Sequence, residues 1–157
     1  MTWSAVVVRG VGGERPAGSV VGWWDRDYDL LGDGPTPPLD VEERGRADHE
    51  LARIEAGWPA MGVEIMPGET IPAETGVTPV AVDFRKGCYP GQELVERMDS
   101  RGATPPRHLR VFDVDPGVVV GDPILDASGA EVGTYTSVAA GKALGYVRRG
   151  AALTPEV

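Results

Sequence analysis

The C-terminal third of the chain contains the segments EVGTYTSV at residues 131–138 and ALGYVR at residues 143–148. Both are rich in β-branched and aromatic residues, which favour strands. With two further segments upstream, the predicted strands are Leu109–Val114, Val118–Val120, Glu131–Val138 and Ala143–Arg148. Turn-forming residues separate them, including Asp115-Pro116-Gly117 and Asp126-Ala127-Ser128-Gly129. This pattern predicts a small antiparallel β-barrel or sandwich over residues 107–157.

The part of the chain before this β domain mixes strands and helices. Apolar residues at helical spacing predict a helix over Arg46–Ala56. The other expected elements are strands at Ser4–Arg9, Ser19–Leu31 and Val80–Phe84, and a helix at Gly91–Met98. The sequence Gly102-Ala103-Thr104-Pro105-Pro106 is typical of a linker. We therefore predict an α+β protein with a mixed N-terminal domain over residues 1–101 and a β-barrel-like C-terminal domain over 107–157.

Composition and charge exclude several classes of function. The 157 residues include 15 Lys and Arg against 24 Asp and Glu, a net charge of −9. An acidic chain without a basic run is a poor partner for a phosphate backbone, so no nucleic-acid partner is expected. No apolar run approaches the roughly 18 residues of a membrane span, so no membrane partner and a cytoplasmic location are expected. A single cysteine excludes an internal disulfide, a zinc finger and a self-contained iron–sulfur site, and no resident metal is expected.

That cysteine lies in the segment Lys86-Gly87-Cys88-Tyr89-Pro90-Gly91-Gln92-Glu93, between the third predicted strand and the second predicted helix. A helix start offers unpaired N–H groups and the positive end of a dipole. Lys86 adds a positive charge two residues away. Both effects favour the thiolate over the thiol, so Cys88 could be nucleophilic, redox-active or a transient metal ligand. Burial of Cys88 as a small hydrophobe is the alternative.

The eight residues Lys86 to Glu93 resemble the K-G-C-Y-x-G-Q-E signature of the YgfZ-type folate-binding proteins, which are relatives of the glycine-cleavage T protein, an aminomethyltransferase. The strings Arg53-Ile54-Glu55-Ala56-Gly57 and Ile71-Pro72-Ala73-Glu74 are similar to strings that the family carries. The segments at residues 133–137 and 143–147 resemble its C-terminal domain. Family members are longer, and this chain resembles their C-terminal half.

The resemblance implies a role in the assembly or repair of iron–sulfur proteins, linked to tetrahydrofolate as cofactor. The expected partners are a folate-type small molecule and iron–sulfur assembly or client proteins. Two alternatives stay open, a tetrahydrofolate-dependent aminomethyl transfer and a scaffold in which Cys88 is structural. Because an additional N-terminal portion forms much of the folate cavity in the family, we expect this chain alone to bind tetrahydrofolate weakly or not at all.

Residue roles follow from the motif and from the resemblance. Cys88 is expected to be the reactive thiol, with Lys86 favouring its charged form. The remaining candidates are expected to form the loop or contact the ligand, and they are Arg53, Gly87, Tyr89, Gly91, Gln92 and Glu93. For Arg53 we weigh a contact with a folate carboxylate or pterin edge against a helix-surface ion pair with Glu50, three residues earlier.

Overall fold

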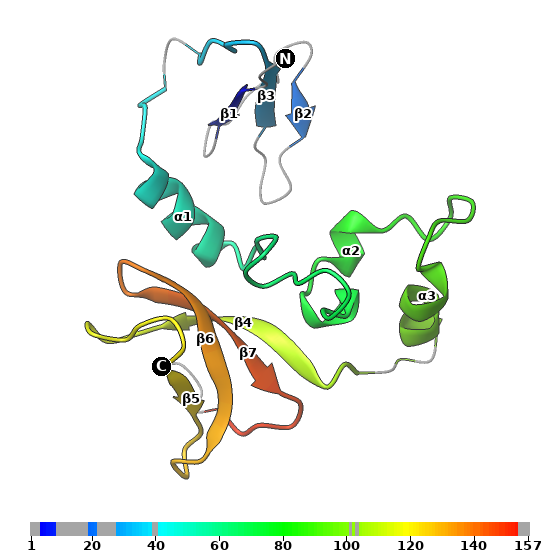
Figure 1. Ribbon diagram of the computed structural model, residues 1–157, viewed down its shortest axis with the longest axis vertical. Coiled ribbons are helices and arrows are strands. Elements are labelled where there is room, and N and C mark those ends of the chain that lie inside the picture. Colours follow the sequence, from blue (N-terminus) through cyan, green and yellow to red (C-terminus); the bar gives the residue numbers. More distant parts are fainter. Residues whose placement is uncertain are drawn as a thin grey trace. The chain divides into compact units, whose positions relative to one another are not determined.

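The computed structural model describes residues 4–8, 19–21, 28–38, 41–100, 102 and 104–153 (Figure 1). The chain forms two compact units, Met1–Arg46 and Ala47–Val157. Within the described residues, no helix has the length and apolar character needed to cross a membrane. The predicted division into domains 1–101 and 107–157 stays a prediction, and its expected linker lies between a helix and a strand of the second compact unit.

A three-stranded antiparallel sheet forms the first unit. Strand β3 (Tyr28–Gly32) lies between β1 (Ser4–Val8) and β2 (Val20–Val21). The expected strand over Ser4–Arg9 is confirmed up to Val8, which is buried, while Arg9 lies outside the described residues. The expected strand over Ser19–Leu31 corresponds to β2 and β3, and residues 22–27 between them lie outside the described residues.

Among the described residues, three α-helices precede the C-terminal sheet, and two of them match the predictions. Helix α1 (Arg46–Glu55) ends before Gly57, whose φ of +66° suits a residue without a side chain. Helix α3 (Gln92–Ser100) confirms the expected helix over Gly91–Met98, except that Gly91 lies in the turn before it. The predicted strand at Val80–Phe84 is wrong, because α2 (Thr78–Ala81) occupies its first half. Pro79 suits the first turn of a helix, and the N–H groups of Val80 and Ala81 both bond to the carbonyl of Val77.

The C-terminal sheet confirms the expected antiparallel β domain and the α+β class. Its strands run in the order β4 (Arg107–Asp113), β7 (Lys142–Arg148), β6 (Glu131–Ala139) and β5 (Pro123–Leu125), all antiparallel, and Figure 1 shows them strongly twisted. Ile124, Val132 and Val147 form its buried core. Phe112 and Tyr135 pack against that core with their rings edge to face, and the ring centres lie 5.5 Å apart.

The predicted strand at Val118–Val120 is wrong, and β5 was missed. The Asp122 carboxylate accepts the N–H of Val119 at 2.9 Å, and Gly121 has a φ of +95°. These contacts form a turn, in which Val119 and Val120 are more than half exposed. Turn chemistry therefore outweighs the strand preference of three consecutive valines.

An ion pair joins the helical segment of the second unit to its sheet. The short 3₁₀ helix η1 (Pro72–Glu74) contacts both α3 and β4. Glu74, which is buried, accepts from Arg107 of β4 at 3.1 Å, and the Arg107 guanidinium lies 4.2 Å from the centre of the Tyr146 ring on β7. The segment just before α2 is therefore fixed to the C-terminal sheet.

Candidate functional site

The Cys88 segment is a loop, residues 83–91, between α2 and α3 (Figure 1). At its start, the carboxylate of Asp83 accepts the N–H of Arg85 at 2.9 Å, and the carbonyl of Asp83 accepts the N–H of Lys86 at 3.3 Å. At its end, Gly91 has a φ of +83°, a conformation that favours glycine. Gly87 has no such requirement, since its φ lies outside this region and a Cβ atom added to it would meet no other atom within 4 Å.

Cys88 is a free and exposed cysteine, so the alternative of a small buried hydrophobe is wrong. Its thiol is open to solvent and can reach a metal ion, a disulfide or a second protein. Helix α3 begins at Gln92, four residues after Cys88, rather than next to it. The N–H of Tyr89 is also occupied, because it donates to the side-chain oxygen of Gln92 at 2.9 Å. The backbone N–H that follows Cys88 is therefore not free to face the sulfur.

Lys86 and Glu93 place opposite charges on either side of the cysteine. The Lys86 ammonium lies 5.3 Å from the centre of the Tyr89 ring, so this cation rests partly on an aromatic face. Glu93 is exposed in the first turn of α3, where a carboxylate interacts favourably with the helix dipole. The loop thus holds its one thiol between a cation and a helix start.

A pocket of about 400 Å³ lies beside this loop, and Phe84 of the loop is one of its lining residues. Phe84 from the loop and Leu94, Val95 and Met98 from α3 contribute to its lining. The remaining lining residues come from the 71–79 segment and Gly102: Ile71, Pro72, Ala73, Gly76, Thr78 and Pro79. The lining has no charged side chain, so the pocket suits apolar groups.

Arg53 lies away from solvent in a network that the sequence did not predict in full. The ion pair with Glu50 is confirmed, with Nε and Nη2 donating to the two carboxylate oxygens at 3.0 and 2.5 Å. The helix-surface description is wrong, because Arg53 is only 5% exposed. Its Nη1 also donates to the carbonyl of Trp58 at 2.5 Å and to Glu64 at 3.1 Å, and Nη2 donates to Ser137 at 2.7 Å. These five contacts match the five donors of a guanidinium, and the predicted folate contact stays a prediction.

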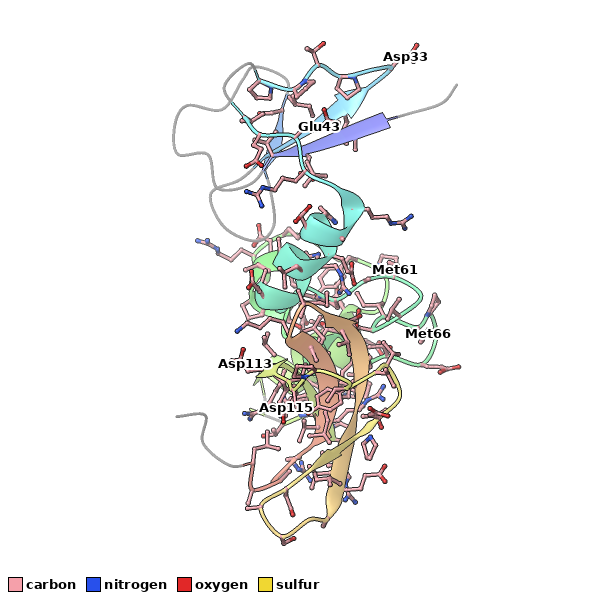
Figure 2. The ribbon with its side chains drawn as sticks, turned by 90° about the vertical axis from the view of Figure 1, so that its left-hand side faces the viewer. Asp33, Glu43, Met61, Met66, Asp113 and Asp115 are labelled. Carbon is pink, nitrogen blue, oxygen red and sulfur yellow. The ribbon has the colours of Figure 1, made fainter. Side chains whose placement is uncertain are left out.

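Glu64 is the partner that sequence reasoning missed. It lies in the turn between Met61 and Met66, and Figure 2 shows these two methionines at the surface of the turn. Glu64 itself is only 1% exposed and accepts hydrogen bonds from Arg53, from the N–H of Ala60 and from the hydroxyls of Thr136 and Ser137 on β6. Three of these donors lie far from Glu64 in the sequence, so no local pattern could reveal them.

The surroundings raise the pKa values of two groups in this network, the Arg53 guanidinium and the Tyr146 hydroxyl. Burial lowers the pKa of Arg53, but the hydrogen bonds and charges of Glu50 and Glu64 outweigh it and hold the pKa above its ordinary value. For Tyr146, burial acts in the opposite direction and raises the pKa to about 12. Its hydroxyl therefore stays protonated and donates to the carbonyl of Glu64 at 2.9 Å. The network therefore ties the turn at Met61–Met66 to β6 and β7.

Cys88 lies in a part of the chain that is similar to a known protein domain. Residues 85–156 match the family profile of the CAF17 C-terminal beta-barrel domain. The C-terminal part of the chain is similar to this domain. The match confirms the predicted barrel-like fold, and it supports the predicted resemblance for the C-terminal part.

The similar relatives are iron–sulfur cluster assembly factors named IBA57. The Cryptococcus neoformans homologue is 38% identical over 94 residues, which are 57% of this chain and 25% of that protein. The human protein is 34% identical over 93 residues, which are 56% of this chain and 26% of that protein. The mouse protein is 33% identical over 105 residues, which are 66% of this chain and 27% of that protein. The chain spans about a quarter of the length of these relatives. Their names place them in the mitochondrion, so the predicted cytoplasmic location is wrong.

Proposed function

We propose that this chain carries the thiol-bearing part of an iron–sulfur cluster assembly or repair factor, linked to tetrahydrofolate, in which Cys88 is the working residue. The observation that carries the proposal is an exposed thiol on a hydrogen-bonded loop, inside the region that matches the CAF17 barrel domain. The relatives named as iron–sulfur assembly factors support the cluster as cargo. Support for the folate link comes from the motif Lys86 to Glu93.

The chemistry of a single thiol determines how the cluster would be held. Iron–sulfur clusters need several ligands, and thiolates are preferred. Among the residues that the structure describes, no three His, Cys, Asp or Glu side chains are grouped so that they could hold a metal ion. Cys88 would therefore supply one thiolate, while a partner protein or small thiol supplies the others. Lys86 would compensate part of the negative charge of a thiolate-ligated cluster.

Nothing among the described residues favours the alternative of aminomethyl transfer. The exposed candidate group is a thiol, and the pocket beside the loop has no charged lining residue that could orient a pterin or activate an amine. Aminomethyl transfer stays a prediction that the experiments below can separate from cluster handling.

We expect Cys88→Ser to lose cluster binding without losing stability. Reconstitution under anaerobic conditions with ferrous iron, sulfide and glutathione lets glutathione supply the missing thiolates. Iron that co-elutes with the chain and its visible absorption measure occupancy. The wild-type chain is expected to hold cluster, and Cys88→Ser is expected to be empty. Because Cys88 is exposed, its replacement should change the free energy of unfolding by less than about 0.5 kcal/mol.

Two variants of neighbouring cations provide matched controls. Lys86→Met is expected to lower cluster occupancy severalfold, because the Lys86 charge lies two residues from the thiol. Arg85→Met removes an exposed cation of similar size one residue further along the chain, so it should lower occupancy less. Equal occupancy in the wild-type chain and in Cys88→Ser would contradict the proposed function. A marked drop in the melting temperature of Cys88→Ser would show a structural cysteine.

Tetrahydrofolate is expected to give no stoichiometric heat in calorimetry with the 157-residue chain. A pterin ring carries many hydrogen-bonding groups and the folate tail is anionic, whereas the pocket beside the loop is lined by apolar side chains with one hydroxyl, that of Thr78. Tight binding at one molecule per chain would show that this chain contains a complete folate site. Retention of that binding in Cys88→Ser would place the folate site apart from the thiol.

A further inference from the structure

We propose that Gln92 is the residue that positions Cys88 for its reaction. This inference rests on the proposed function, because it needs Cys88 to be the working thiol. Gln92 opens α3, and its hydrogen bonds go to the backbone of Tyr89 rather than to the sulfur. Its action therefore runs through the backbone of the residue that follows the cysteine.

Gln92 holds both backbone groups of Tyr89. Its side-chain oxygen accepts the N–H of Tyr89 at 2.9 Å, and its own N–H donates to the carbonyl of Tyr89 at 3.3 Å. The N–H of Tyr89 belongs to the peptide plane whose carbonyl carbon is part of Cys88. Because a peptide unit is planar, an acceptor that fixes this N–H also fixes the orientation of the Cys88 carbonyl and narrows the directions open to its side chain.

The other end of the loop is held in a similar way, so that the cysteine lies between two attachment points. Asp83 accepts the N–H groups of Arg85 and Lys86 before the cysteine, and Gln92 accepts that of Tyr89 after it. Cys88 lies between them and is exposed. An exposed thiol on a free loop would sample many directions, and a shared cluster requires its ligands in a defined geometry. The Gln92 contact supplies this restriction on the side nearer the helix.

Three variants separate positioning from support of the helix. Gln92→Met has a similar length and removes the acceptor. Gln92→Glu keeps an acceptor oxygen in the first turn of α3, where a negative charge is tolerated. Glu96→Gly weakens α3 at an exposed position beyond the loop. Occupancy is titrated against glutathione concentration under the reconstitution conditions above, and the circular dichroism of the bound cluster in the visible range reports the geometry of its ligands.

Gln92→Met is expected to bind cluster about tenfold more weakly, which corresponds to the loss of roughly one hydrogen bond, and to show an altered visible circular dichroism. Gln92→Glu and Glu96→Gly are expected to stay within about twofold of the wild-type chain, with its spectrum. Should Gln92→Met fail to fold, Gln92→Ala replaces it.

The possible outcomes distinguish this inference from the function on which it rests. Wild-type occupancy and spectrum in Gln92→Met, while Cys88→Ser is empty, would overturn the positioning role alone. An equal loss in Glu96→Gly and Gln92→Met would also overturn it, because helix support would then explain the effect. Wild-type occupancy in Cys88→Ser would overturn the proposed function itself.

Discussion

Arg53→Met is expected to lower the free energy of unfolding by about 3–5 kcal/mol, the range seen when one partner of a buried ion pair is removed. The variant leaves the carboxylate of Glu64 buried at 1% exposure without its cation. Glu50, the other partner of Arg53, is partly exposed, so water can replace the lost contact there. Denaturant unfolding followed by circular dichroism measures the change.

Two controls test the physical reason for this loss. Arg44→Met breaks an ion pair with Glu42 in which both side chains are more than half exposed, and it is expected to cost at most about 1 kcal/mol. Combining Arg53→Met with Glu64→Gln removes both charges and should recover roughly 1–2 kcal/mol relative to the sum of the single changes. A cost for Arg53→Met as small as that for Arg44→Met would contradict a stabilising buried pair.

Gly133→Ala is expected to be as damaging, at about 3 kcal/mol or more, because two strands approach each other closely at this position. A Cβ atom on Gly133 would lie 2.0 Å from the carbonyl oxygen of Tyr146 and 3.1 Å from the Cα of Val147. Both neighbours are backbone atoms of β7, so relief requires the β6–β7 pairing to separate. Thermal and denaturant unfolding measure the loss.

Gly87→Ala is the matched control for this prediction. A Cβ atom on Gly87 would have no other atom within 4 Å, and the φ of this residue is not positive. Alanine there is expected to leave stability unchanged or to raise it by up to about 1 kcal/mol, because it restricts the unfolded chain. Wild-type stability in Gly133→Ala would contradict the register in which Gly133 lies opposite Val147.

Local patterns were sufficient where the same pattern of apolar or strand-forming residues extends over a whole element. The apolar spacing within Arg46–Ala56 predicted α1, and the β-branched and aromatic residues of three C-terminal segments predicted β4, β6 and β7. The same reasoning failed at Val80–Phe84 and Val118–Val120, where runs of five and three residues carry too little preference. Pro79 favours a helix start through its fixed φ, and Asp122 forms a turn by accepting the N–H of Val119.

For the candidate site, the amino-acid sequence alone determined the motif Lys86 to Glu93 and the presence of one thiol, because these are properties of adjacent residues. The Arg53–Glu50 pair was also within reach, since three residues span one helical turn. Tertiary structure determined the exposure of Cys88 and the burial of Arg53. Glu64 meets Ser137 of β6 across 73 positions, and only the folding of the sheet against the turn brings the two together. Burial and such distant partners depend on how elements pack, and no local spacing encodes that packing.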